Sequence, residues 1–257
     1  TDFPSLVGLE SAYTSDKYTY LDSDYAGKAK EAVNLYLQSG GTGGMTEEQK
    51  AMIDSALNIV IPEGVQLVKP GLFKEKEKEN EGKILTTAAE NTFGMTVTAF
   101  SLDKIEGGVE EEKKVTDPVT NKETIEVTVK EGTGTFAGCR YLTGVTLNND
   151  AARPVTIEDH AFRNCVKLEN ASMANVSSLG VRPFAGCEKL ADINFQNSEK
   201  YTCENSIIFE KDGSGNKFKV VECLEGRPAK YVNPEEMTGI TELADEAFME
   251  CENLRRV

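Results

Sequence analysis

Glu158-Asp159-His160 is the one triplet of the chain whose residue types suggest acid–base chemistry. It contains the single histidine and two carboxylates, which the general acid and base of a hydrolase could use to move protons. Catalysis requires side chains that converge on a reacting atom, and three neighbours along a chain offer no such convergence by themselves. The triplet therefore supports only the weakest of three functional hypotheses, a hydrolase.

Cysteine is the other residue type that could supply chemistry, as a nucleophile, a disulfide partner or a metal ligand. The chain has 6 cysteines and 1 histidine, so only one cysteine–histidine pair could form. A zinc site is disfavoured because there is neither a Cys-x-x-Cys pair nor a second histidine. The segment from Asp212 to Asn216 is similar to part of a calcium loop but lacks the closing acidic residue, so we expect a hairpin turn. We therefore expect no metal and no cofactor.

Four of the cysteines belong to copies of one pattern, Phe-x-x-Cys-x-x-Leu, which indicates a repeat. The positions that we expect to form its core are Phe136, Cys139, Leu142, Phe162, Cys165, Leu168, Phe184, Cys187, Leu190, Phe248, Cys251 and Leu254. A recurring unit is typical of a solenoid, in which each repeat buries its apolar face against its neighbours. Serine at position 165 would then bury an unpaired hydroxyl and destabilise more than alanine. Cys203 and Cys223 lie outside the pattern, and the sequence leaves open whether they form a disulfide.

Comparison of the repeats weakens the acid–base interpretation of the triplet. Asp159 and Asp245 occupy the same position before the phenylalanine, where a carboxylate typically caps a short helix by accepting backbone N–H groups. His160 occupies the position of Arg182 and Glu246, so we expect that position to be polar and exposed. A structural role is therefore the better interpretation of all three residues of the triplet.

Each repeat is expected to contain a short helical turn followed by a strand. Phenylalanine, cysteine and leucine at i, i+3 and i+6 fall on one side of a helical segment. The period then changes to two, as in Val145 and Leu147, which indicates a strand with one buried face. An aliphatic residue comes shortly before the phenylalanine in three copies, whereas the copy at Phe136 has Glu131 in that position. Strands joined by such crossovers form a parallel sheet.

The complete pattern, aliphatic-x-x-x-Ala-Phe-x-x-Cys-x-x-Leu-x-x-Val-x-Leu, resembles the BspA-type leucine-rich repeat of bacterial surface proteins. The resemblance is clearest from Ile157 to Met173 and from Leu243 to Val257, while a third copy has Pro183 in the alanine position. It implies an α/β solenoid, a leucine-rich-repeat-like right-handed array of short parallel strands and short helical turns. It also implies a non-catalytic protein at the surface of a bacterial cell or outside it, with a protein or glycan ligand that could be host-derived.

The pattern divides the chain into two regions. Residues 1–58 are expected to form a helical N-terminal cap region with helices at 24–39 and 46–57, and residues 59–257 the leucine-rich-repeat domain. We expect that domain to contain a degenerate, insert-containing part, a part with regular repeats, and a β-hairpin insert within the latter. Their ranges are 59–131, 132–257 and 198–231.

The outward side of the repeat strands is the candidate binding surface. By alternation, the polar residues expected on it are Asn148, Asn170, Ser172, Asp192, Asn194 and Gln196. Sheet faces of solenoids are common binding surfaces. This one lacks the tryptophan, tyrosine and arginine that dominate protein hot spots, and it has no aromatic platform on which a sugar could stack. A merely solvated face with asparagine-rich cross-strand hydrogen bonds therefore stays open.

The charge of the chain disfavours two classes of partner. Its 257 residues include 28 basic and 43 acidic side chains, a formal net charge of -15. The phosphates of nucleic acid and the surface of an anionic membrane would repel such a protein. No apolar run reaches the roughly 20 residues that a membrane-spanning helix needs.

Three functional hypotheses follow, in decreasing order of support. The first is a non-catalytic cell-surface or secreted repeat protein that mediates adhesion or macromolecular binding through its solenoid surface. The second is a structural spacer or scaffold domain of a larger envelope protein. It is supported by ends that look trimmed, because the chain starts at Thr1 without a methionine and stops at Val257 within a repeat. The third is the hydrolase.

Overall fold

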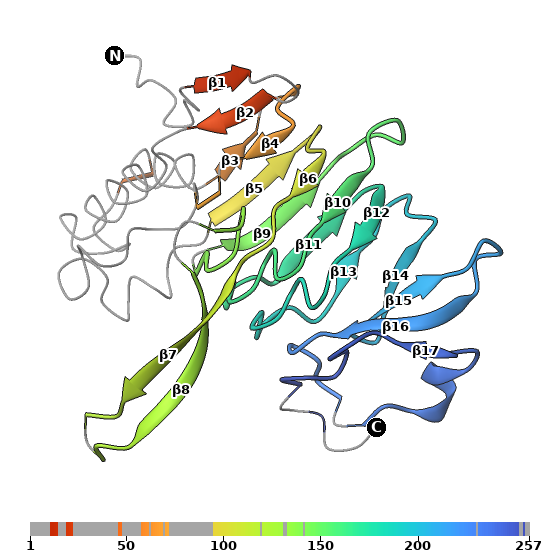
Figure 1. Cartoon of the computed structure of the whole chain (residues 1–257). Helices are drawn as coiled ribbons and strands as arrows, with labels where there is room; N and C mark the ends of the chain where they lie inside the picture. The colour runs from red at the N-terminus through yellow and green to blue at the C-terminus, as the bar shows by residue number, and fades with distance from the viewer. Residues whose placement is uncertain are drawn as a thin grey trace.

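In the part of the chain that the computed structural model describes, strands form nearly all of the regular structure (Figure 1). The structure describes residues 11–14, 19–22, 46–47, 58–61, 63–68, 70–71, 95–118, 120–130, 133–140, 142–229, 231–251 and 254. The helices predicted at 24–39 and 46–57 lie outside these residues, apart from Thr46 and Glu47. Within them the helix with defined bounds is the short 3-10 helix η3 (Pro234–Met237). No helix of the described part of the chain is long and apolar enough to cross a membrane.

A five-stranded parallel sheet runs through the repeats in the order β13-β11-β9-β5-β3 (Figure 1). Its strands are β3 (Asn58–Val60), β5 (Met95–Ala99), β9 (Leu142–Leu147), β11 (Asn170–Met173) and β13 (Ile193–Asn194). Equivalent apolar residues of successive repeats lie side by side and are buried, namely Ile59, Val97, Val145, Ala171 and Ile193. The predicted parallel sheet is confirmed, and the sheet extends through two strands before the regular repeats.

A second parallel sheet contains the aliphatic residue that precedes the phenylalanine in the first three copies of the pattern. It consists of β6 (Lys104–Ile105), β10 (Val155–Ile157) and β12 (Val176–Leu179). Ile105 lies in register with Ile157, the aliphatic position of the next repeat. The apparent irregularity at Glu131 therefore has a simple cause, because an insertion separates Ile105 from its own Phe136.

The segments that carry the phenylalanine and cysteine are β-turns, so the predicted helical turns are wrong. The N–H of Cys165 donates to the carbonyl of Phe162 at 3.1 Å, and the N–H of Leu168 donates to the carbonyl of Cys165 at 2.9 Å. Asn164 lies between them with a φ of 60°, in the left-handed region. The equivalent residues also have positive φ: Gly138, Gly186 and Glu250. A left-handed residue in every unit ends the right-handed helical path after one turn.

The interior of the array is a ladder of stacked side chains. The rings of Phe136 and Phe162 stack with centroids 5.2 Å apart, and those of Phe162 and Phe184 do the same at 5.2 Å. The Sγ–H of Cys165 donates to the carbonyl of Phe136 at 3.1 Å, and that of Cys187 donates to the carbonyl of Phe162 at 3.2 Å. Each thiol therefore links its own repeat to the preceding one.

The β-hairpin insert is a three-stranded antiparallel unit that separates the third copy of the pattern from the fourth. Its strands are β14 (Tyr201–Glu204), β15 (Ile207–Lys211) and β16 (Lys217–Cys223), which pair antiparallel, and β17 (Glu242–Leu243) then pairs parallel to β16. The fourth copy packs in a separate core with this insert, through Ile207, Phe209, Val220, Cys223, Ala247 and Cys251. Phe248 and Leu254 are accordingly only partly buried.

A second insertion forms a two-stranded ribbon that projects from the array (Figure 1). It consists of β7 (Glu110–Thr116) and β8 (Glu123–Val129), paired antiparallel, and we call it the arm. At the N-terminal end, β1 (Ser11–Thr14), β2 (Thr19–Asp22) and β4 (Leu67–Val68) form a third small sheet. The boundaries predicted for the domains stay predictions.

Candidate functional site

Of the six residues that the sequence suggests for binding, Asn170, Ser172 and Asn194 lie in strands of the five-stranded sheet. The other three, Asn148, Asp192 and Gln196, lie within two residues of a strand end. Five of the six are exposed, and the sixth, Ser172, is half-buried: Asn148, Asn170, Asp192, Asn194 and Gln196 are the exposed ones. The register places Ser172 beside Thr146 on one side and Asn194 on the other. Alternation along the strands therefore brings these side chains onto one surface, built from three successive repeats.

Sequence reasoning missed the part of this surface that β3 and β5 contribute. Thr96 and Thr98 lie in register with Gly144 and Thr146, and the Oγ1–H of Thr96 donates to Oδ1 of Asn58 at 2.9 Å. Phe100, directly after β5, is 40% exposed, so the surface does include an aromatic side chain. The alternation of Met95-Thr-Val-Thr-Ala-Phe100 was the signal that could have revealed this strand.

We call this surface the strand face. It consists of Asn58, Val60, Thr96, Thr98, Phe100, Thr146, Asn148, Asn170, Ser172, Asp192, Asn194 and Gln196. Asp192 is its one charged member, although 28% of all residues of the chain are charged. Depletion of charge combined with amide and hydroxyl groups distinguishes the strand face from the rest of this acidic protein.

The carboxylates of the acid–base triplet point to different partners. Oε2 of Glu158 accepts a hydrogen bond from the N–H of Gly107 at 3.0 Å, and its Oε1 lies 3.2 Å from Nζ of Lys104. Oδ1 of Asp159 accepts from the N–H of Val181 in the next repeat at 2.7 Å. Asp159 thus joins two repeats. The sequence predicted instead that it would cap its own turn. Both carboxylates have structural partners and no common target.

An open pocket of about 430 Å³ lies beside these residues on the second sheet. Its walls include Gly107, Gly180, Thr156, Ser178 and the two carboxylates of the triplet. The histidine of the triplet does not line it. Glu158 and Asp159 both line the pocket, but their carboxylates accept hydrogen bonds from different backbone N–H groups, those of Gly107 and Val181.

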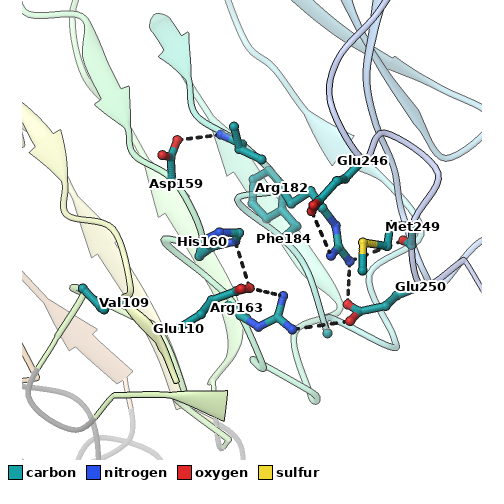
Figure 2. A network of polar contacts seen from close by, with 12 residues as sticks. Val109, Glu110, Asp159, His160, Arg163, Arg182, Phe184, Glu246, Met249 and Glu250 are labelled. Atoms are coloured by element: carbon teal, nitrogen blue, oxygen red, sulfur yellow. Dashed lines mark hydrogen bonds and ion pairs between the residues drawn. The ribbon is translucent and has the colours of Figure 1, made fainter. Parts of the chain in front are cut away.

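His160 belongs to a network of charged side chains on the turn side of the array (Figure 2). Its Nδ1 lies 3.6 Å from Glu110, and a nitrogen of Arg163 lies 2.8 Å from the same carboxylate. Arg163 and Arg182 both contact Glu250, which comes from the fourth copy of the pattern. Their side chains are 4% and 3% exposed. The side chain of His160 is 17% exposed, so the prediction of an exposed position is wrong for His160 and Arg182. At Glu246, in the same position of the fourth copy, the prediction is confirmed.

Within the network, the pKa values of Arg182 and Glu250 are shifted toward the charged forms. Burial alone would lower the pKa of Arg182, but its hydrogen bond to Glu250 and the negative charges around it together raise it. Burial alone would likewise raise the pKa of Glu250, but hydrogen bonds from Arg182 and the charge of Arg163 lower it. The network is thus a set of mutually compensated charges that joins the base of the arm, two repeats and the fourth copy.

Glu222 replaces a backbone carbonyl where the hairpin interrupts the array. In the second repeat the N–H of Phe162 donates to the carbonyl of Pro183 at 2.7 Å. In the third repeat the equivalent N–H, that of Phe184, donates to Oε2 of Glu222 at 3.3 Å. Burial raises the pKa of Glu222 to about 8, although this N–H and the charge of Arg182 favour the ionised form.

Glu225 likewise takes the place of a backbone carbonyl, for the N–H group two residues after that of Phe184. The N–H of Asn164 donates to the carbonyl of Ala185 at 2.8 Å, whereas the equivalent N–H of Gly186 donates to Oε1 of Glu225 at 2.6 Å. Burial raises the pKa of Glu225 as well. The two carboxylates therefore complete the hydrogen bonding of the third repeat in place of the missing next repeat.

The cysteines form no disulfide, and the pair left open by the sequence, Cys203 and Cys223, consists of two free thiols. Burial raises the pKa of Cys165 well above its usual range and that of Cys203 to about 12. A thiol held protonated is a poor nucleophile. Within the described residues no group of three or more histidine, cysteine and acidic side chains could hold a metal ion. Oδ1 of Asp212 accepts from the N–H groups of Ser214 and Asn216, both at 2.9 Å, as a turn requires.

Comparison with known proteins bears on the repeat. Residues 120–219 match the BspA type leucine rich repeat region, in six copies. A crystal structure of a leucine rich cell surface protein from Faecalibacterium prausnitzii A2-165 aligns over 78% of this chain and 68% of that chain, with 14% identity and a TM-score of 0.28. A similarity of that size supports no argument about this chain. None of the curated proteins matches it. The chain therefore carries BspA-type leucine-rich repeats over residues 120–219, as its Phe-x-x-Cys-x-x-Leu pattern predicts.

Proposed function

We propose that this protein is a non-catalytic binding protein that holds a neutral, hydroxyl-rich ligand such as a glycan against the strand face. The observation that carries the proposal is the near absence of charge on that face in a chain with a net charge of -15. Charged residues are depleted at the centres of binding interfaces because their desolvation is costly. A face that only needed to stay solvated would have no reason to exclude them.

The chemistry of the strand face fits such a ligand. Asparagine, threonine and serine side chains offer both donors and acceptors, which can match hydroxyl groups whose own orientation is free to adapt. Phe100, at one end of the face, offers the apolar ring surface on which a sugar could lie. A protein ligand is the second candidate, because Val60 and Phe100 lie exposed at the same end of the face.

We further propose that the protein acts at the surface of a bacterial cell or outside it, in adhesion. This rests on the BspA-type repeats and on the kind of protein in which such repeats occur. Labelling of intact cells of the source organism with an antibody to this chain tests it. Labelling only after cell lysis would contradict the proposed location.

The first prediction compares two half-buried serines on parallel strands, Ser172 on the strand face and Ser178 on the second sheet. Ser172→Lys places an uncompensated charge at the centre of the strand face, and we expect it to weaken retention on immobilised neutral glycans by roughly tenfold or more. Ser178→Lys leaves the face intact and should bind like the wild-type protein. Phe100→Ala should weaken glycan retention but leave the circular dichroism spectrum unchanged.

The same experiment separates the proposed function from its alternatives. Retention of matrix proteins but not of glycans would favour the protein ligand. Equal loss in both lysine variants would place the binding site elsewhere. A folded protein that is retained on neither surface would support the spacer hypothesis and overturn the proposal.

A further inference from the structure

The arm presents an unpaired strand edge. Among the described strands, β7 pairs only with β8. The carbonyl of Val109 accepts from the N–H of Lys130 at 2.7 Å, and the carbonyl of Val115 accepts from Oγ1 of Thr124 at 3.3 Å. The odd-numbered residues of β7 thus direct their backbone groups toward β8. Because these groups alternate sides along a strand, those of the even-numbered residues in 110–116 face the open edge.

The sequence along this edge is complementary to itself in an antiparallel arrangement. It reads Val109-Glu-Glu-Glu-Lys-Lys-Val115, with the acidic residues first and the basic residues after them. If two copies pair antiparallel about Glu112, opposite charges meet on both sides of the centre. The contacts are then Glu111 with Lys113, Glu110 with Lys114, and Val109 with Val115, each made twice. Glu112 alone meets its own counterpart.

The register about Glu112 also suits the backbone. Glu112 is even-numbered, so its N–H and carbonyl face the open edge and can form the pair of hydrogen bonds that centres an antiparallel contact. Val109 is 53% exposed in the single chain and would gain an apolar neighbour directly across the new strand pair. A two-stranded ribbon is only marginally stable in water, whereas a sheet of more strands with an apolar face is more stable. Ile125 and Val127 of β8 are exposed apolar side chains of the arm.

We propose that β7 pairs with β7 of a second copy of this chain, antiparallel about Glu112, so that two arms join into a four-stranded sheet and the protein self-associates. The occupant is a second copy because the charge order of the strand complements its own reverse. Opposite charges placed directly across strands stabilise such a pair, and like charges weaken it. The base of the arm is held by the contact between Glu110 and Arg163, which orients the edge.

The second prediction tests this register with two adjacent glutamates. Glu111→Lys places lysine opposite Lys113 of the partner, so sedimentation velocity of the full chain should show a dimer dissociation constant raised by roughly tenfold or more. Glu112→Gln removes the one like-charge contact and should lower it. Glu111 lies opposite Thr128 in its own arm, so neither change breaks a charge pair within the arm.

Matched controls account for the net charge, which both substitutions make less negative. Glu199 is exposed and lies outside the arm, so Glu199→Lys and Glu199→Gln should leave the dissociation constant unchanged. General repulsion between acidic chains would fall in Glu111→Lys, so weaker association there cannot come from net charge. A wild-type chain that stays monomeric at about 100 μM, a concentration at which even weak pairing of this kind is populated, overturns the proposal. So does equal behaviour of the variants at 111 and 112.

A cross-linking measurement reads the register directly and does not depend on charge reversal. Glu112→Cys places thiols at the two-fold centre, so oxidation with glutathione disulfide should give a covalent dimer. Each bond forms as two thiols lose their hydrogens and the glutathione disulfide is reduced to two thiols. Lys122→Cys, at the tip of the arm, should give none. Equal cross-linking at both positions would contradict the register.

Discussion

At the scale of single residues, the buried thiols take part in hydrogen bonds that the sequence does not reveal. From the pattern alone, serine in place of Cys165 is expected to bury an unpaired hydroxyl. In the structure the Sγ–H of Cys165 donates to the carbonyl of Phe136, and the same carbonyl also accepts from the N–H of Cys139 at 2.9 Å. A hydroxyl at position 165 would find the same acceptor, so the expectation of an unpaired group is wrong.

The third prediction follows from that hydrogen bond. Cys165→Ser and Cys165→Ala should each lower the free energy of unfolding by about 1–2 kcal/mol, with serine no more costly than alanine. Chemical denaturation of the two variants measures the difference. A serine variant less stable than the alanine variant by more than about 1 kcal/mol would show that the hydroxyl is unpaired. Labelling of the native thiol at position 165 should be slow, because the side chain is fully buried.

At the scale of elements, the recurring turn explains why the repeat is not helical. Gly138, Asn164, Gly186 and Glu250 share one position and all have positive φ. Glycine and asparagine tolerate the left-handed region, so their recurrence could have predicted a turn there. The strands were easier to predict, because alternation of buried and exposed residues depends only on the local chain.

The junction between the third repeat and β16 depends on a hydrogen bond to a carboxylate of β16 that no sequence motif indicates. Glu222, at the end of β16, supplies the acceptor that a following repeat would otherwise provide. A carboxylate in this position has to be buried, which favours its protonated form. The stability of this junction therefore depends on pH.

The fourth prediction gives the sign of that dependence. The folded-state pKa of Glu222 is about 8, against an ordinary value of 4.5, so the folded protein keeps a proton that the unfolded chain releases between these values. The stabilising contribution is present below pH 4.5 and is lost as the pH rises toward 8, with a slope of up to about 1.4 kcal/mol per pH unit. Glu222→Gln keeps an acceptor for the N–H of Phe184 but does not titrate. Urea denaturation from pH 5 to pH 8 should show a smaller slope in this variant than in the wild type.

Exposed Glu199 lies away from this junction and provides the control for the pH experiment, since Glu199→Gln should leave the pH dependence unchanged. Glu225 contributes in the same direction as Glu222, so some slope should persist in Glu222→Gln. A wild-type protein whose stability increases from pH 5 to pH 8 would contradict the assignment.

At the scale of the whole molecule, the arginine network holds the fourth copy of the pattern against the array across the hairpin insert. The aromatic stack ends at Phe184, and the fourth copy packs in its own core with the insert. Arg163 and Arg182 bridge the two parts by contacting Glu250. Removing this carboxylate would leave two nearly buried guanidinium groups with less compensation.

The fifth prediction is that Glu250→Gln loosens the C-terminal part. We expect a loss of about 1–2 kcal/mol in the free energy of unfolding, less than for a fully buried pair because Glu250 is partly exposed. Amide hydrogen exchange should accelerate within 231–251 and stay unchanged within 142–198. Glu242→Gln, in exposed β17, is the matched control and should change neither region. Uniform acceleration across both regions would argue against a local contact.

The sequence by itself determined the repeat, its buried phenylalanines and cysteines and the parallel sheet, because these depend on residue spacing within one unit and its stacking on identical neighbours. It also indicated six polar residues that lie in β9, β11 and β13 or next to the ends of these strands. Only the tertiary structure showed that Thr96, Thr98 and Phe100 continue the strand face and that Ile105 belongs to the repeat of Phe136. The insertion that forms the arm separates these residues from Phe136 along the chain, and the repeat spacing is interrupted there.

Contacts between distant parts of the chain also explain why the three side chains of the acid–base triplet do not converge. Sequence proximity placed Glu158, Asp159 and His160 together, but their side chains contact three different residues, namely Gly107, Val181 and Glu110. Contacts between residues distant in sequence are decided by how whole repeats and insertions pack. The tertiary structure therefore turned a possible catalytic site into three links between repeats and insertion, while the repeat that positions them was determined by the sequence.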